Sequence, residues 1–232
     1  MKHDSEIKLV EDIKIVADPE GLAALAGLVG EERALEASFE LLTKARSLRG
    51  PRLVYRDCMV GERGEDFVTL CDGVINSRVM AVNLEQTGHA FPFVATCGKE
   101  IEEWTASFET GLEKFLAETI RTLALASALR TLDDRIREKF DSEEVGMMNP
   151  GSLPDWPLTE QGVLFDLLGK EVSQAGITLN DDMFMYPSYS ASGIKYPAQE
   201  AFQSCLLCSQ EDCPNRRMEY DPELYDRKYS KE

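Results

Sequence analysis

Residues 147–160 read MMNPGSLPDWPLTE, and this stretch constrains the fold most strongly. Pro150, Gly151 and Pro154 predict an irregular loop up to Asp155, because proline lacks an amide donor and glycine favours turns. Pro157 then opens a predicted helix, whose apolar residues continue to a stop at Gly169. A loop that leads into a helix N-terminus offers free backbone amides to a ligand, although most such loops only connect elements.

A second pattern follows that helix, where residues 177–193 read ITLNDDMFMYPSYSASG. The alternating apolar residues around Met183–Met185 predict a strand. Ser190, Ser192 and Gly193 predict a tight turn at its end, with hydroxyls and amides that could hold a polar ligand. The alternative is a serine-rich turn that satisfies its own backbone.

Two helices are predicted in the N-terminal part of the chain. Asp18 is a good N-cap and Pro19 a good first helical residue, so one helix begins there and runs to Gly30. A second helix spans 31–48 and stops at Gly50. The apolar residues predicted to face the core are Leu22, Leu25, Leu28, Leu35, Phe39, Leu41 and Leu42.

The middle of the chain changes its hydrophobic period. Short β-rich runs at 53–55, 67–70 and 79–82 predict strands, and the apolar run at 90–96 is cut by Pro92. Helical spacing returns over 101–140 and predicts a long buried helix. Glu102–Glu103 and Asp133–Asp134 are interpreted as solvated faces of that helix. Helices and an antiparallel or mixed sheet arranged in this way are typical of the α+β class.

Composition restricts the partners and the location of the protein. The 232 residues include 42 acidic and 25 basic ones, for a net charge of −17, which disfavours binding to nucleic acid or anionic membranes. No apolar run approaches the ~20 residues of a membrane span. Residues 1–6 are polar, unlike a signal peptide. A cytoplasmic protein is predicted, whose six cysteines are thiols or ligands rather than disulfides.

Three cysteines near the C-terminus form the pattern C-x2-C-x4-C-P, made of Cys205, Cys208, Cys213 and Pro214. Thiolates at this spacing predict an iron–sulfur cluster, with zinc as the alternative, and a proline after the last cysteine is common beside clusters. Arg216 and Arg217 would offset the thiolate charge.

A fourth ligand is missing from that segment. Cys97 is the first choice, because it ends a predicted strand beside Gly98, where backbone can approach a cofactor closely. Cys58 and Cys71 are alternatives, although simple burial explains both more readily.

Taken together, Pro150-Gly151, the WPLTE of 156–160, Ile177-x-Leu179 and the pattern Met185-x-Pro187-x-x-Ser190-x-Ser192-Gly193 resemble the activation domain of cobalamin-dependent methionine synthase. The closest resemblance is to free-standing, short versions of that domain, and it is strongest over 145–193. It implies an α+β fold in which a twisted antiparallel sheet packs against long helices. We expect this domain to cover residues 1–198, and 199–232 to form a C-terminal cysteine segment.

The resemblance also implies a function. In that family the domain binds S-adenosylmethionine and docks over a corrinoid held by another domain, so that one-electron reduction and methyl transfer restore methylcobalamin. This chain would then be an accessory protein for reductive activation of a corrinoid-binding methyltransferase, with an electron-donor protein as a further partner. The residues expected to face the cofactors are Asn149, Pro150, Gly151, Ser152, Ser190, Ser192 and Gly193.

Two departures leave S-adenosylmethionine binding open. Met147 stands where the family has an arginine for the ligand carboxylate, and Ser152 where it has a tyrosine. The alternative function is an iron–sulfur or zinc-binding redox or interaction protein on the same fold, which binds neither corrinoid nor S-adenosylmethionine.

Overall fold

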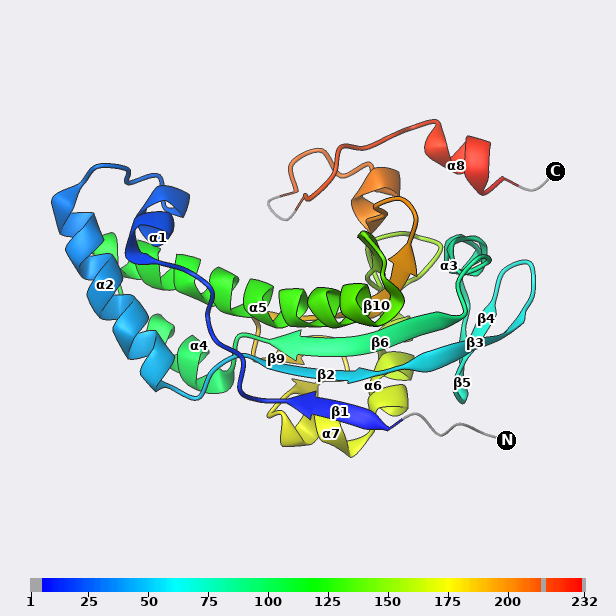
Figure 1. Ribbon diagram of the computed structural model, residues 1–232, viewed down its shortest axis with the longest axis horizontal. Helices are drawn as coiled ribbons and strands as arrows, with labels where there is room; N and C mark the ends of the chain where they lie inside the picture. Colours follow the sequence, from blue (N-terminus) through cyan, green and yellow to red (C-terminus); the bar gives the residue numbers. More distant parts are fainter. Residues whose placement is uncertain (1–5, 214–215, 231–232) are drawn as a thin grey trace.

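A computed structural model describes residues 6–213 and 216–230 of the chain. The signal-peptide argument from residues 1–5 and the interpretation of Pro214 lie outside the described residues. The framework is an antiparallel sheet with helices on both faces (Figure 1), which confirms the predicted α+β class. None of the described helices is long and apolar enough to cross a membrane.

The main sheet runs in the order β1, β2, β6, β10, β7. Strands β3, β4 and β5 form a meander that joins this sheet where β3 pairs with β6. A separate hairpin joins β8 to β9. The strands are β1 (Ile7–Val10), β2 (Arg52–Arg56), β3 (Cys58–Arg63), β4 (Val68–Leu70), β5 (Gly73–Ile75), β6 (His89–Thr96), β7 (Glu144–Met148), β8 (Thr178–Leu179), β9 (Met185–Tyr186) and β10 (Ser190–Ala198).

Strand β6 lies at the centre and continues through Pro92 instead of being cut there. Along one edge of β6, β2 pairs with the second half of β6 and β3 pairs with the first two residues of β6, in the same register. The pairing lapses where Pro92 faces the junction between β2 and β3, after the pair Tyr55–Phe93 and before Cys58–Ala90. Proline has no amide hydrogen for the ladder, so its position explains why the neighbouring strand is divided there.

The helices cover the two faces of the sheet, as Figure 1 shows. Because strand side chains alternate, β6 directs Phe93 to α5 on one face and Val94 to α6 and α7 on the other. An N-terminal pair of helices and α4 pack against the first half of α5. The helices are α1 (Pro19–Leu25), α2 (Glu32–Ser47), α3 (Arg78–Asn83), α4 (Lys99–Ala106), α5 (Gly111–Phe140), α6 (Gln161–Leu168), α7 (Lys170–Gln174) and α8 (Leu224–Lys228).

Several helix ends agree with the prediction. The Asp18 carboxylate accepts the Gly21 amide at 2.6 Å and begins α1, and Gly169, with a φ of 57°, ends α6. The long predicted helix is instead two, α4 and α5, separated by residues 107–110. The predicted inward positions Leu25 and Phe39 are wrong, since their exposed fractions are 66% and 63%. Leu35 is exposed as well, and so is Leu158, an apolar residue of the helix predicted to open at Pro157.

The predicted strand at residues 79–82 is wrong, because these residues form helix α3. Two side chains cap its N-terminus: Ser77 Oγ accepts the Met80 amide at 3.0 Å, and the Asp155 carboxylate accepts the amides of Arg78 and Val79 at 3.1 and 3.2 Å. A cap from a residue so far along the chain overrides the strand preference of the β-branched valines.

The prediction that all six cysteines are thiols or ligands is also wrong. Cys58 at the start of β3 forms a disulfide with Cys71, which follows β4. These two residues are therefore excluded as alternatives for the fourth metal ligand. A cytoplasmic location stays a prediction.

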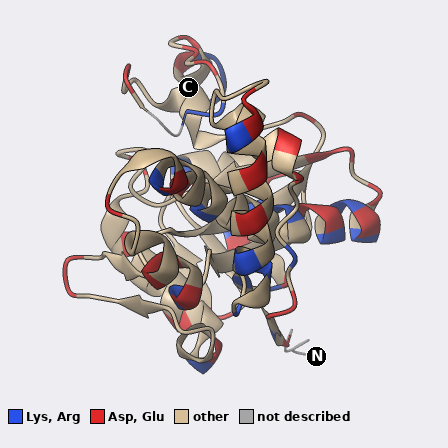
Figure 2. Ribbon diagram, turned by 90° about the vertical axis from the view of Figure 1, so that its left-hand side faces the viewer, with Lys and Arg blue, Asp and Glu red and all other residues tan. Residues whose placement is uncertain are grey.

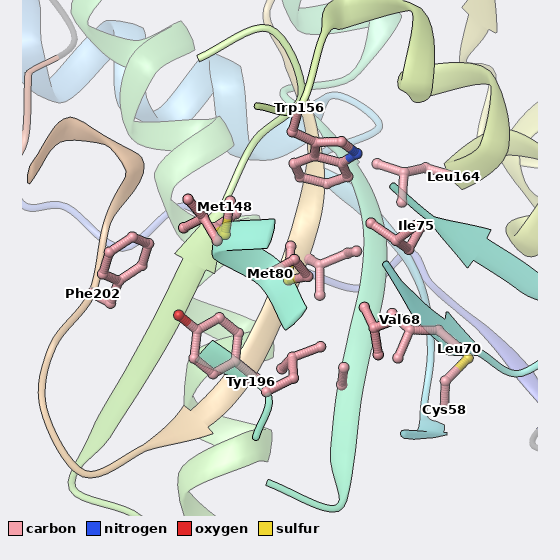
Figure 3. Close-up of a cluster of buried hydrophobic side chains, with 14 of the residues drawn as sticks. Cys58, Val68, Leu70, Ile75, Met80, Met148, Trp156, Leu164, Tyr196 and Phe202 are labelled. Atoms are coloured by element: carbon pink, nitrogen blue, oxygen red, sulfur yellow. The ribbon is translucent and has the colours of Figure 1, made fainter. Parts of the chain in front are cut away.

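The segment after β10 packs onto the same core as the domain before it. A 3-10 helix (Ser204–Leu207) follows β10, and Phe202 and Tyr229 are buried in a cluster with Trp156, Met80 and Met148. Figure 3 shows Trp156, Met80, Met148 and Phe202 around this cluster, with Cys58 at its edge. Tyr229 is held by Asn83, whose Oδ1 accepts its hydroxyl at 2.7 Å. The domain boundary between 198 and 199 stays a prediction.

Candidate functional site

The predicted cofactor-facing residues come together where β7 lies beside β10. Met148 pairs with Ile194 in the ladder, so the turn that follows β7 meets the first half of β10. Ser190, Ser192 and Gly193 therefore lie within a strand, and the tight turn predicted for them is wrong.

Two glycines allow the chain to pass closely at this junction. A Cβ on Gly193 would lie 2.3 Å from the Met148 carbonyl oxygen and 2.9 Å from Asn149 Nδ2. Gly151 has a φ of 80°, and its amide donates to the Trp156 carbonyl at 2.8 Å. Only glycine fits the approach at 193, and it is the residue best suited to the left-handed backbone at 151.

A hydrogen-bonded network occupies the polar side chains of this junction. Asn149 Nδ2 donates to the Ser192 carbonyl at 2.7 Å, and Ser192 Oγ donates to Gln161 Oε1 at 2.8 Å. Gln161 Nε2 in turn donates to the Met183 carbonyl at 2.9 Å. Ser190 Oγ donates to the Pro187 carbonyl at 2.6 Å. Pro150 is buried, whereas Gly151 and Ser152 at the turn reach solvent. The junction therefore forms a rigid platform, with the 151–152 turn as its accessible part.

Sequence reasoning missed two residues that hold this platform. Gln161 links β10 to the 183 loop, and nothing in its position at the start of α6 marks it. Glu102 is 8% exposed and accepts the amides of Ser188 and Tyr189, both at 3.0 Å, so its interpretation as a solvated residue is wrong. Asp133, which was also assigned to a solvated face, pairs with buried Lys195 at 2.6 Å.

The C-terminal cysteines lie in a loop organised by one arginine. The Arg216 guanidinium donates to the carbonyls of Cys205 and Cys208 at 3.4 and 3.2 Å, and also to that of Gln210. The Arg217 amide donates to Cys205 Sγ at 3.5 Å. The three thiols are partly exposed.

The cysteines do not form a gathered ligand set. Within residues 6–213 and 216–230, no group of three or more His, Cys, Asp or Glu side chains is placed to hold a metal ion. Cys97 lies in the core between α4 and α5, whereas Cys208 packs against the Trp156 cluster. Burial, with a contribution from the Glu102 carboxylate, raises the pKa of Cys97 to about 12, so this thiol stays protonated at neutral pH. The structure thus does not bring Cys97 to the other three.

The C-terminal segment also supplies a guanidinium beside Met147. Met147 is 3% exposed, and Arg217 Nη1 lies 3.5 Å from its sulfur atom. Arg217 follows the cysteine pattern in the sequence and lies 70 residues from Met147, so no local motif could have paired them.

No family model matches the sequence, and no curated protein matches it. Among solved structures, the chain is similar to the MetH reactivation domain bound to AdoHcy, with a TM-score of 0.61 and 17% identity over 86% of this chain and 81% of that one. This likeness shows the fold and confirms the predicted packing of a twisted antiparallel sheet against long helices.

Proposed function

We propose that this chain is an accessory module that supports reductive reactivation of a corrinoid-dependent methyltransferase. It would dock on the corrinoid-binding protein through the turn at residues 151–152 and the adjoining ends of β7 and β10. An electron-donor protein would be a further partner.

The observation that carries this proposal is the likeness to a reactivation domain over most of both chains. The segment with the sequence resemblance supports it, because residues 147–151 and 190–193 lie side by side on the shared framework. The Gln161 network keeps that platform rigid, and a rigid platform reduces the entropy lost when a partner docks.

Docking is tested by immobilising the full chain and measuring binding of the cobalamin-binding fragment of a methionine synthase, loaded with Co(II) cobalamin. We expect saturable binding. Ser152→Trp should weaken it by filling the accessible turn, whereas Ser173→Trp, a matched change at an exposed residue on α7, should not. Absence of binding by the unaltered chain, or equal binding by both variants, would contradict the proposal.

Direct binding of S-adenosylmethionine is the finer part of the proposal. The AdoHcy in the similar structure and the accessible turn after Asn149 support it, while Met147 removes the expected carboxylate partner. Calorimetry of the full chain with S-adenosylmethionine should give a saturable heat. A flat titration would confine the function to docking.

A separate proposal concerns Cys205, Cys208 and Cys213, which we propose to ligate an iron–sulfur cluster or zinc after local closure of their loop. The Arg216 guanidinium, which donates to the carbonyls of Cys205 and Cys208, and the Arg217 amide on Cys205 Sγ support it, because they order the loop that carries the thiols. Anaerobic purification, followed by metal and sulfide analysis, tests it. Cys213→Ser should remove the bound metal, and Cys97→Ser should leave it. A metal-free protein, or an unchanged metal content in Cys213→Ser, would rule out this assignment.

A further inference from the structure

The N-terminal helix pair, α1 and α2, leaves apolar side chains uncovered. Figure 1 shows this pair at one end of the molecule, beyond the sheet. Among the described residues, the large apolar side chains that are exposed between residues 16 and 39 are Val16, Leu25, Val29, Leu35 and Phe39. Single exposed apolar residues are ordinary, but several that gather in one region mark a surface for interaction.

Two of these side chains line a groove between the start of α1 and the first half of α2. The groove has a volume of about 890 Å³, and Pro19, Leu35 and Phe39 form its apolar wall. Leu35 and Phe39 are four residues apart in α2, so they lie one turn apart on the same face. An apolar ridge of this kind can receive the apolar face of another helix.

The charged residues that line the groove are acidic. They are Asp18, Glu20, Glu36 and Glu40. In the part of the chain that the structure describes, none of the four forms an ion pair. Glu36 and Glu40 lie one turn apart on α2, where like charges repel each other. Figure 2 views the molecule from this end and shows acidic residues following one another along a helix that faces the viewer.

The charge of the rim selects among the possible occupants. A second copy of this chain would bring a second acidic rim against the first, and nucleic acid or an anionic membrane would be repelled for the same reason. A basic partner is attracted instead. A helix with apolar residues on one face and lysine or arginine beside them would place the apolar face on Leu35 and Phe39. Its cations would then lie beside Glu36 and Glu40.

We propose that the groove between α1 and α2 docks a basic amphipathic helix of a partner protein. The groove shares no residue with the turn at 151–152 or with the ends of β7 and β10. This inference therefore goes beyond the function proposed above and does not depend on it.

Fluorescence anisotropy of a labelled peptide, titrated with the full chain, tests the groove. The probe is a peptide of about 15 leucines and lysines whose leucines lie on one helical face. A second peptide has the same composition in an order without an apolar face, and it controls for unspecific attraction to an acidic protein. We expect saturable binding of the first peptide, at least about tenfold tighter than that of the second.

The apolar wall is tested by Phe39→Ser, which should weaken binding of the first peptide about tenfold, because an aromatic contact is lost. Phe184→Ser, the same change at an exposed residue outside the groove, should have no effect. Both side chains are exposed, so neither substitution should disturb the core.

The acidic rim is tested by the double variant Glu36→Gln and Glu40→Gln. This variant should weaken binding about threefold or more and should reduce the dependence of the affinity on salt. Glu138→Gln with Glu143→Gln, the same change at two exposed residues outside the groove, should do neither.

Three results would overturn the proposal: no saturable binding up to about 100 μM, equal affinities of the two peptides, or equal affinities of Phe39→Ser and Phe184→Ser. Sedimentation of the full chain gives a fourth. Self-association that Phe39→Ser abolishes would assign the groove to a second copy of the chain instead. None of these measurements uses the corrinoid protein, so their failure is distinct from a failure of the proposed function.

Discussion

The β7–β10 junction and the C-terminal segment treat their polar groups in opposite ways. At the junction, the side chains of Asn149, Ser192 and Gln161 form hydrogen bonds with one another or with the backbone. In the C-terminal segment, three thiols are partly exposed and Arg217 rests against a methionine sulfur. The junction carries the recognisable sequence pattern. The C-terminal segment has more polar groups whose hydrogen-bonding or ligand capacity is not used within the protein.

This difference separates two meanings of a sequence pattern. Pro150, Gly151 and Gly193 mark a place where two strands must approach closely, so they specify architecture. Capacity to bind depends on charges without partners, which only the assembled chain reveals. The sequence pattern can thus locate the β7–β10 junction, while the groups that could bind a ligand come from the C-terminal segment.

The largest loss of stability is expected from a substitution of Gly193 at the β7–β10 junction. Gly193→Ala should lower the free energy of unfolding by about 3 kcal/mol, because the new Cβ would meet a backbone carbonyl that cannot move away. Gly162→Ala in α6 is the matched control: nothing lies within 4 Å of its Cβ, and we expect a gain of about 0.5 kcal/mol. Urea unfolding measures both. Equal stabilities would show that the junction is loosely packed.

The buried Lys195–Asp133 pair gives the next largest effect. Asp133→Asn leaves buried Lys195 without its carboxylate and should cost about 2 kcal/mol, reduced from the fully buried case because the Asp133 side chain is 24% exposed. Asp134→Asn, one residue away and 65% exposed, should cost under about 0.5 kcal/mol. Thermal or urea unfolding separates them. A larger cost at 134 would refute the assignment of Asp133 as the partner of Lys195.

The buried thiol of Cys97 makes the stability of the protein depend on pH. Its folded pKa of about 12 lies above the ordinary value of 9.0, so the unfolded state loses its proton first as the pH rises. The stabilisation from the protonated thiol is present below pH ~9 and is lost between ~9 and ~12. The stability advantage of the unaltered chain over Cys97→Ala should shrink by about 1 kcal/mol between about pH 8 and about pH 10. A constant difference in urea unfolding would place Cys97 in contact with solvent.

The sequence predicted the parts of the fold that local chemistry determines. Asp18 and Gly169 mark helix ends because capping acts within a few residues. The 79–82 run was mistaken for a strand because its cap, Asp155, comes from a distant loop. Phe39 was mistaken for a core residue because it is apolar and lies at a helical spacing from other apolar residues. In the structure it lies on a face of α2 that no other element covers, among the described residues.

The site was predictable to a similar degree. The family resemblance assigned residues 149–152 and 190–193 to one site, and these two segments do meet in the structure, while their role toward a cofactor stays a prediction. The Lys195–Asp133 pair, the Arg217–Met147 contact and the Cys58–Cys71 disulfide were not predictable, because each joins residues that only the sheet order or loop packing brings together. Such pairings depend on topology and not on any periodic signal.

The function proposed for this chain is to assist reactivation of a corrinoid protein. The most direct test is to follow, by absorption spectroscopy, the conversion of Co(II) cobalamin to methylcobalamin on the cobalamin-binding fragment of methionine synthase, given S-adenosylmethionine and a one-electron reductant. We predict that the full chain accelerates methylcobalamin formation and that Ser152→Trp reduces the acceleration more than Ser173→Trp does. An unchanged rate when the chain is added would contradict the account.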